Sequence, residues 1–165
     1  MKFAIIGGTH GNEPVGIKSI ENLTIKSQHH SYQTFVGNPK AYNIQKRYVD
    51  SDLNRSFGDS GKAKGYELER SKELTDQIQG QFDFILDLHT TTSNMGLTVI
   101  LTKIDETSLR AACYLQELIP DLKIIVSMRA GADCPYTSAL AQSALTVEFG
   151  PVSNNVVATS LVKSM

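Results

Sequence analysis

The sequence predicts an α/β protein with three layers, in which helices cover both faces of a central, mostly parallel sheet of mixed type. The first observation is that short apolar runs alternate with segments of helical periodicity along the chain. Strands that alternate with helices form largely parallel sheets whose two faces are both covered. The second observation is size, since 165 residues with 41% hydrophobic and 20% charged residues are typical of one globular domain.

The first half of the chain begins with a strand and a helix. Residues 3–6 are an apolar run ended by two glycines, which predicts a buried strand. Pro14 suits the first turn of the next helix, because its missing N–H does no harm there. We expect this helix to reach about Leu23. Its expected inward positions are Val15, Ile17 and Ile20. Residues 34–36 predict a second short strand.

The middle of the chain is predicted to hold a long loop before the next helix. Residues 40–64 are polar, and a loop of this length is uncommon unless it carries function. Residues 66–78 predict a helix, with Leu68 and Leu74 as its inward positions. A further helix is predicted over residues 109–119. The remaining strands are predicted over residues 82–88, 97–101, 124–126 and 145–147.

Charge and composition exclude several classes of partner. The formal net charge is −1, so neither nucleic acid nor an anionic membrane surface is expected as a partner. No apolar run approaches the roughly 18 residues of a membrane span, and the first run is too short and too soon broken by glycine to be a signal peptide. Cys113 and Cys134 are far apart and do not suggest a disulfide framework. We therefore expect a reduced, cytoplasmic protein.

The most informative pattern is a pair of segments at the ends of two predicted strands. Residues 7–13 (Gly-Gly-Thr-His-Gly-Asn-Glu) and residues 87–89 (Asp-Leu-His) supply His10, Glu13 and His89. In open α/β sheets, ligands gather outside the carboxyl ends of the strands. Two imidazoles and one carboxylate suit a catalytic zinc ion that keeps one position open. Taken singly, either histidine could instead have a structural role, at a helix start or in the core.

A zinc hydrolase also needs a base that takes a proton from water and returns it to the leaving group. Glu148 is the candidate, because a carboxylate at the end of an apolar strand is costly to bury without a task or a partner. A structural ion pair or a partner for a helix N-terminus is the alternative. Asp87 could support His89 as the partner of a metal ligand. It could equally orient the loop of residues 50–55, and the sequence does not decide.

Residues 47–57 concentrate charge in the long loop. Arginine recognises carboxylates with two parallel hydrogen bonds, so Asn54 and Arg55 could hold the carboxylate of a substrate. Arg47 could polarise a carbonyl group and stabilise an oxyanion. A salt-bridged surface loop is the alternative. The hydroxyl-rich residues 90–96 suit the wall of a polar pocket, or a plain turn between strands.

Four segments together resemble the aspartoacylase family, the aspartoacylase and succinylglutamate desuccinylase branch of the zinc carboxypeptidase-like hydrolases. The resemblance runs in order from residue 2 to about residue 157. It is carried by Gly-Gly-Thr-His-Gly-Asn-Glu at 7–13, Asp-Leu-Asn-Arg at 52–55, Asp-Leu-His-Thr-Thr-Thr-Ser-Asn-Met-Gly at 87–96 and Val-Glu-Phe-Gly-Pro at 147–151. The third segment favours aspartoacylase over the desuccinylase. A zinc carboxypeptidase-like fold is implied.

The resemblance also implies a mechanism and its residues. One Zn2+ per chain would be held by His10, Glu13 and His89. Glu148 would be the general base, and Arg47 would stabilise the oxyanion. The substrate carboxylate would be bound by Asn54 and Arg55. The implied reaction is the hydrolysis of N-acetyl-L-aspartate to acetate and L-aspartate, and a deacylase similar to succinylglutamate desuccinylase, acting on another small N-acyl amino acid, is the alternative.

Two departures from the family pattern stand out. Family members usually carry a further carboxylate-binding arginine shortly before the base, where this chain has Ser138; Arg129, further back, is a possible substitute. The family also has a C-terminal β-rich domain, and we expect residues 1–165 to be the zinc-hydrolase catalytic domain without it. A truncated relic that binds a metal or a metabolite without turnover is therefore a further alternative. Apolar surface left uncovered could promote a homo-oligomer.

Overall fold

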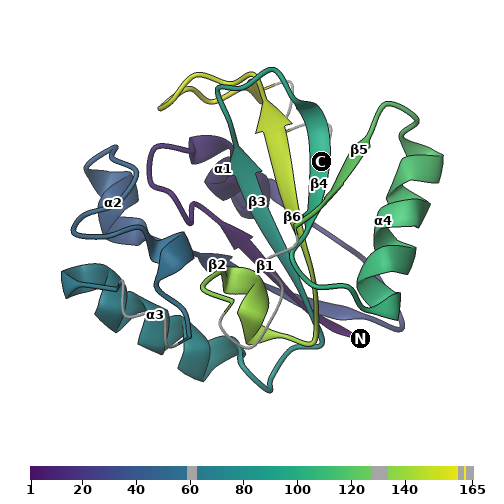
Figure 1. The fold of residues 1–165 in the computed structure, drawn as a ribbon, viewed down its shortest axis with the longest axis horizontal. Helices are drawn as coiled ribbons and strands as arrows, with labels where there is room; N and C mark the ends of the chain where they lie inside the picture. The colour runs from purple at the N-terminus through teal and green to yellow at the C-terminus, as the bar shows by residue number, and fades with distance from the viewer. Residues whose placement is uncertain (59–62, 128–133, 160–161, 163–165) are drawn as a thin grey trace.

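The computed structural model describes residues 1–58, 63–127, 134–159 and 162. A six-stranded sheet with the strand order β2-β1-β3-β6-β4-β5 forms the centre of the described part (Figure 1). Its strands are β1 (Lys2–Gly7), β2 (Ser31–Val36), β3 (Phe84–Thr90), β4 (Gly96–Leu101), β5 (Lys123–Val126) and β6 (Ser143–Gly150). The helices are α1 (Pro14–Asn22), α2 (Pro39–Asn43), α3 (Gly65–Ile78) and α4 (Glu106–Leu118), with short 3-10 turns η1 (Leu53–Arg55) and η2 (Thr137–Leu140).

The sheet is mixed, as the sequence predicted. Strands β2, β1, β3 and β6 are parallel to their neighbours in that order. Strand β4 runs antiparallel to β6, and β5 runs parallel to β4. A short connection joins β3 to β4, whereas a parallel pair needs a crossover of about a dozen residues. Strand β6, which comes last in the chain, lies between them.

Alternate side chains of the strands pack on opposite faces of the sheet and create the three layers. On one face, Ile6 and Ile85 lie in a buried cluster with Leu74 of α3 and with residues of η2. On the other face, Ile5 and Leu88 lie in a second cluster with residues of α1 and α4. Strands buried on both faces carry apolar residues at successive positions, which explains the continuous apolar runs of β1 and β3.

Helix α1 lies very close to the ends of β1 and β3. A Cβ atom on Gly7 would clash with the backbone of Gly16, and one on Gly16 would clash with the carbonyl oxygen of Leu88. Only glycine permits this approach. Gly8 then turns the chain with a φ of +70°, so the segment after β1 returns toward β3 before α1 begins. The predicted inward positions of α1 are all buried: Val15, Ile17 and Ile20.

Two expectations for the middle of the chain need correction. The segment 40–64 is not entirely a loop, because most of α2 and all of η1 lie in it. The prediction that Leu68 faces inward is wrong, since this side chain is exposed. The buried positions of α3 are Glu67, Ser71, Leu74 and Ile78. Their spacing of three and four residues defines one helix face, and Leu68 lies outside it.

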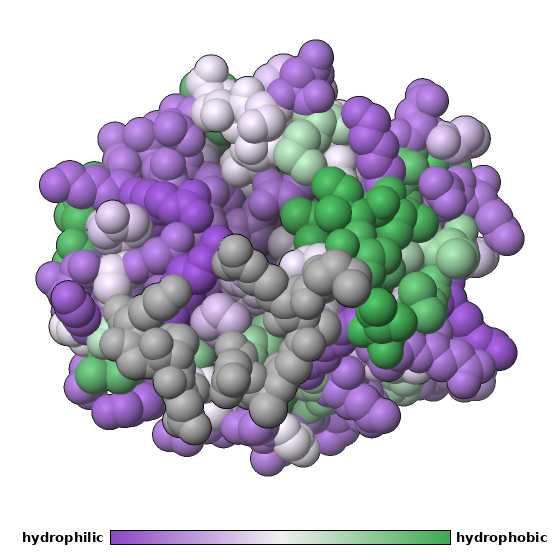
Figure 2. Space-filling model, viewed as in Figure 1, coloured by the Kyte–Doolittle hydropathy of each residue, from purple (hydrophilic) through white to green (hydrophobic). Residues whose placement is uncertain are grey.

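The face of the molecule in Figure 2 is largely hydrophilic. Apolar atoms gather on it where Figure 1 places β4 and β5. On β5, Ile125 and Val126 are exposed at the edge of the sheet. Within the described part of the chain, no helix has the length and apolar character needed to cross a membrane.

Candidate metal and hydrolytic site

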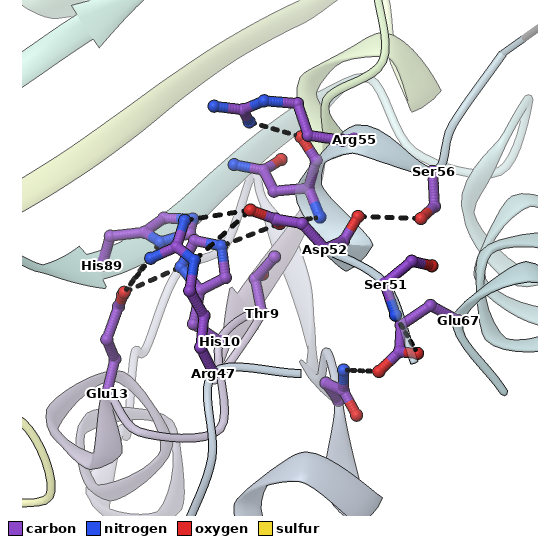
Figure 3. Close-up of polar contacts among 12 residues, drawn as sticks. Thr9, His10, Glu13, Arg47, Ser51, Asp52, Arg55, Ser56, Glu67 and His89 are labelled. Carbon is purple, nitrogen blue, oxygen red and sulfur yellow. Dashed lines mark hydrogen bonds and ion pairs between the residues drawn. The ribbon is translucent and has the colours of Figure 1, made fainter. Parts of the chain in front are cut away.

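The carboxyl ends of β1 and β3 bring the three predicted metal ligands together. His10 follows β1, Glu13 precedes α1, and His89 lies in β3. His10 Nδ1 lies 2.7 Å from Glu13 Oε1, and His89 Nδ1 lies 3.0 Å from Glu13 Oε2. The three side chains are buried, and their ligand atoms all lie within 4.8 Å of one another. Figure 3 shows them pointing toward one another.

A second carboxylate contacts the Nε2 atom of each imidazole, on the side away from Glu13. His10 Nε2 lies 3.1 Å from Asp52 Oδ1, and His89 Nε2 lies 2.9 Å from Asp87 Oδ2. In a neutral imidazole, a proton donated from Nε2 leaves Nδ1 with a free lone pair. Both rings are therefore oriented so that Nδ1 faces the centre of the cluster.

Asp87 supports His89, which was one of the two roles that the sequence left open. It is completely buried and accepts hydrogen bonds from Thr9 Oγ1 at 2.8 Å and from Thr137 Oγ1. Its link to the charged loop is indirect: the backbone N–H of Thr137 donates to Asn54 Oδ1 at 3.2 Å. Asp87 thus contacts the imidazole itself and reaches the loop through η2.

Burial and charge compete in this cluster. Burial raises the pKa of Glu13, but the interactions with His89 and His10 outweigh it and hold this pKa well below its usual value. Burial also raises the pKa of Asp87, and His89 again brings it below the usual value. Burial lowers the pKa of His89, but Asp87 and Glu13 raise it well above its usual value. The carboxylates therefore remain ionised at neutral pH.

This donor set fits a zinc ion. Two imidazoles and one carboxylate are the three protein ligands of many catalytic zinc sites, which keep the fourth position open. Metal-binding histidines usually donate their other N–H to a carboxylate, as both rings do here. The backbone N–H of Thr90 donates to Glu13 Oε2 at 3.1 Å and so holds the carboxylate, which is the third of the possible metal ligands, in place. His10, Glu13 and His89 could therefore hold one metal ion.

Glu148 lies beside His89 in the sheet. The two residues are register partners in the parallel pairing of β3 with β6, and paired side chains leave the same face. Glu148 Oε2 is buried without a hydrogen-bond partner in the described part of the chain. Burial raises the pKa of Glu148 above its usual value, against the lowering effect of His89. A raised pKa suits a group that takes up and returns protons.

Arg47 reaches the cluster from the charged loop. Its guanidinium lies 3.5 Å from Glu13 Oε1 and 3.1 Å from Asp52 Oδ2, and its side chain is 44% exposed. The carbonyl oxygen of Arg47 accepts a hydrogen bond from the N–H of Gly11, which joins the loop to the segment after β1. Arg47 therefore combines a position beside the ligand set with access to solvent.

Asn54 and Arg55 lie against η2. The Arg55 guanidinium lies 4.8 Å from the centre of the Tyr136 ring, and its Nη1 donates to the carbonyl oxygen of Asn54 at 2.6 Å. The backbone N–H of Arg55 donates to the carbonyl oxygen of Asp52 at 2.9 Å, so Arg55 belongs to the same turn as the residue that contacts His10 (Figure 3). The salt-bridged loop that was the alternative is present too, since Asp52 pairs with Arg47.

The residues near the expected second arginine form a different contact. Ser138 is buried, and its Oγ lies 2.5 Å from Thr102 Oγ1. Arg129, the possible substitute, lies outside the described residues. The hydroxyl-rich segment 90–96 joins β3 to β4 as a turn, while its first residue, Thr90, contacts Glu13.

Sequence reasoning missed several supporting residues. Asp52 was part of the segment 52–55, but nothing in the spacing showed that it would contact His10. Thr9 was part of the segment 7–13, but neither Thr9 nor Thr137 was given a role, because the hydroxyl partners of a threonine depend on the fold. Tyr136 was likewise not singled out. These residues position the predicted side chains and do not replace them.

The model of the succinylglutamate desuccinylase/aspartoacylase catalytic domain matches residues 1–164. The chain belongs to this family. The matched range includes every helix and strand named above.

Relatives of this family member include named amide hydrolases. A probable aspartoacylase of Trichodesmium erythraeum is 35% identical over 173 residues, covering 97% of this chain and 59% of that protein. A human N-acyl-aromatic-L-amino acid amidohydrolase (carboxylate-forming) is 32% identical, covering 99% of this chain and 57% of that protein. This family member therefore spans less than two thirds of the length of either relative.

A solved structure confirms the fold prediction. The crystal structure of murine aminoacylase 3 matches this family member with a TM-score of 0.89 and 30% identity, over 100% of this chain and 60% of that chain. The mixed sheet with helices on both faces is thus the zinc carboxypeptidase-like fold that the four segments implied.

Proposed function

We propose that residues 1–165 form the catalytic domain of a zinc-dependent amidohydrolase that deacylates a small N-acyl amino acid. The observation that carries the proposal is the convergence of His10, Glu13 and His89 beside Glu148. A buried metal-ligand set, next to a carboxylate whose Oε2 has no hydrogen-bond partner among the described residues, suits the hydrolysis of an amide. The names of the relatives, as amide-hydrolysing enzymes, support the same reaction class.

His10, Glu13 and His89 would hold one Zn2+. When bound there, zinc would supply a Lewis acid that polarises the acyl carbonyl and makes water more acidic. Asp52 and Asp87 would keep both imidazoles turned toward the ion.

Glu148 would act as the general base and then as the general acid. Its free Oε2 would take a proton from the attacking water and give it to the departing amine nitrogen. The raised pKa of Glu148 supports this exchange, because it makes the carboxylate a stronger base toward water, and a pKa closer to the operating pH suits a group that both accepts and donates a proton.

The charged loop would bind and polarise the substrate. Arg47, next to Glu13, would stabilise negative charge on the former carbonyl oxygen. Asn54 and Arg55 would hold the carboxylate of the amino acid. N-acetyl-L-aspartate is the first substrate to test, on the resemblance of residues 87–96, and a succinyl group is the alternative acyl group.

The test is carboxylate release by the purified, zinc-loaded protein from a panel of N-acetyl-L-aspartate, N-succinyl-L-glutamate and N-acetyl-L-phenylalanine. Glu148→Ala should lower the rate about 100- to 10,000-fold, while Glu117→Ala, a change at an exposed glutamate of α4, should not alter it. Equal turnover by wild type and Glu148→Ala would show that the base is misassigned. Zinc and substrate binding without release would favour the non-catalytic relic.

The proposal includes a cytoplasmic location and the formation of a homo-oligomer. Cys113 and Cys134 are both free, which agrees with a reducing compartment. The oligomeric state can be tested by light scattering over a wide range of concentrations, and cell fractionation tests the location.

A further inference from the structure

A buried carboxylate outside the metal cluster binds the backbone of the charged loop. Glu67, in the first turn of α3, is 0% exposed. Its Oε1 accepts hydrogen bonds from the N–H of Val49 at 2.7 Å and from Asn38 Nδ2 at 2.9 Å. Its Oε2 accepts from the N–H groups of Asp50 at 2.9 Å and Ser51 at 3.1 Å. Both oxygens are thus used to hold consecutive backbone amides.

The three amides lie between two side chains of the candidate site. Arg47 comes shortly before residues 49–51 and Asp52 directly after them. Asp52 contacts His10 at 3.1 Å, and Arg47 lies 3.5 Å from Glu13. Figure 3 shows Asp52 between Glu67 and the imidazole of His10. A shift of this backbone would move both side chains relative to the ligand set.

One helical turn later, α3 anchors a second segment beside the site. Arg70 Nη2 donates to the carbonyl oxygen of Val36 at 2.7 Å, and its Nε donates to that of Gly37 at 2.9 Å. The next residue, Asn38, donates its backbone N–H to the carbonyl oxygen of Gly8 at 2.8 Å. Helix α3 therefore holds the loop after β2, which in turn contacts the glycine turn before His10.

A fully buried charged side chain is rare on the inward face of a helix such as α3. The position of Glu67 belongs to the buried face that includes Leu74 and Ile78, where an apolar side chain would also fit the helix pattern. Burial raises the pKa of Glu67, but the hydrogen bonds from Val49, Asn38 and the next two amides outweigh it, and the pKa lies below its usual value. Because burying a charge is costly, a buried carboxylate that binds three backbone amides indicates that it serves to hold the backbone of this loop in one position.

We propose that Glu67 is a positioning residue for the deacylation reaction, which it serves by fixing the backbone of residues 49–51 and, through it, the Arg47 guanidinium. This inference rests on the proposed function of the site. It assigns to α3 a role in setting the geometry of the oxyanion-stabilising group.

The first test uses Glu67→Gln, which keeps the size of the side chain but turns an NH2 group toward backbone N–H groups. Amide hydrogen exchange should become about tenfold faster or more at residues 49–51 and stay unchanged in β3. The control is Glu69→Gln, at an exposed position of the same helix, which should leave exchange unchanged. If residues 49–51 exchange in Glu67→Gln as in wild type, the proposal is overturned.

The second test is a double-mutant cycle at saturating zinc. Glu67→Gln should lower kcat about 10- to 100-fold, because small displacements of catalytic groups are costly, with KM changed less than about threefold. In an Arg47→Ala background the same substitution should lower kcat less than about twofold, because the group through which it acts is gone. Equal factors in both backgrounds would reduce Glu67 to a general structural role and overturn the proposal.

Failure of the proposed function would be visible separately. A wild-type protein that releases no carboxylate from any substrate contradicts that function. The double-mutant cycle then uses another measurement, the calorimetric affinity for a phosphonamidate analogue of N-acetyl-L-aspartate, whose tetrahedral centre mimics the oxyanion.

If Glu67→Gln does not fold, Glu67→Asp takes its place, because it keeps the charge but withdraws the carboxylate from the amides. The expected coupling to Arg47 is the same.

Discussion

Removing the charge of Asp87 should weaken zinc binding without removing a ligand. Asp87 is 0% exposed, and its Oδ2 lies 2.9 Å from His89 Nε2. The substitution Asp87→Asn preserves the size of the side chain. Its remaining oxygen can still face the imidazole, while its NH2 group can donate to the hydroxyl of Thr9, which is able to accept. The loss is therefore mainly that of charge behind the ring.

The magnitude follows from comparing charged with neutral hydrogen bonds. A hydrogen bond to a charged group contributes about 1.5–3 kcal/mol and a neutral one about 0.5–1.5 kcal/mol. The difference of about 1–1.5 kcal/mol corresponds to a dissociation constant for zinc that is about tenfold higher. Losses of about 10- to 100-fold are typical when partners of metal-binding histidines are changed, so we expect the lower end of that range.

The assay is competition for zinc with a chromophoric chelator at pH 7. Asp83→Asn, a change at an exposed aspartate just before β3, is the matched control and should keep the wild-type affinity. The melting temperature of the metal-free variants shows whether the fold is retained. A folded Asp87→Asn protein that binds zinc within about twofold of wild type would refute the reasoning.

Three further outcomes are expected. Arg55→Ala should raise KM for N-acetyl-L-aspartate about 10- to 100-fold in steady-state assays, since a charge-assisted hydrogen bond is lost; an unchanged KM would remove Arg55 from the carboxylate site. Leu74→Ala, at a fully buried position of α3, should lower the free energy of unfolding in urea by about 2–5 kcal/mol; a smaller loss would mean that the cluster closes around the gap. In the folded chain the pKa of Glu67 is lowered from 4.5. The ionised carboxylate therefore contributes fully to the free energy of unfolding above pH 4.5, and this contribution is lost as the pH falls through the pKa of the folded state. The stability difference between wild type and Glu67→Gln should therefore shrink in acid, and a difference independent of pH would count against this assignment.

Local patterns predicted the elements of the fold, but not their order in the sheet. The apolar runs of β1 and β3 predicted buried strands, and Pro14 predicted the start of α1. The short connection between β3 and β4 also suffices to show that these two strands do not pair directly in parallel. Nothing local showed that β6 would insert between β3 and β4, because that pairing joins segments far apart in the chain.

The errors have identifiable physical causes. Helix α4 was predicted from residue 109, although it starts at Glu106, because Asp105 caps it by accepting the N–H of Ser108. That signal was readable from an aspartate before a helical pattern. The wrong inward assignment of Leu68 was not avoidable in the same way. Glu67 takes the inward place because three backbone amides from another segment require it.

The sequence predicted those parts of the candidate site that lie at the ends of strands. The ends of β1 and β3 are adjacent in a parallel pair, so His10 and His89 could be brought together by reasoning on topology alone. The contact of His10 with Asp52 depends on the path of the charged loop. That path is set by hydrogen bonds to α3, and no periodicity in the sequence records it.

Hydrogen bonding separates the carboxylates of this region into two kinds. Both oxygens of Glu13, Asp87 and Glu67 contact donors of the protein. Glu148 differs, because its Oε2 is buried with no partner in the described part of the chain. An unsatisfied buried acceptor costs about 1–3 kcal/mol, so a partner for Oε2 is expected from outside the protein, as water or a substrate N–H. The carboxylates whose oxygens both have partners hold other groups in place, whereas the Oε2 atom of Glu148 has no such task within the described residues, which agrees with the proposed role in proton transfer.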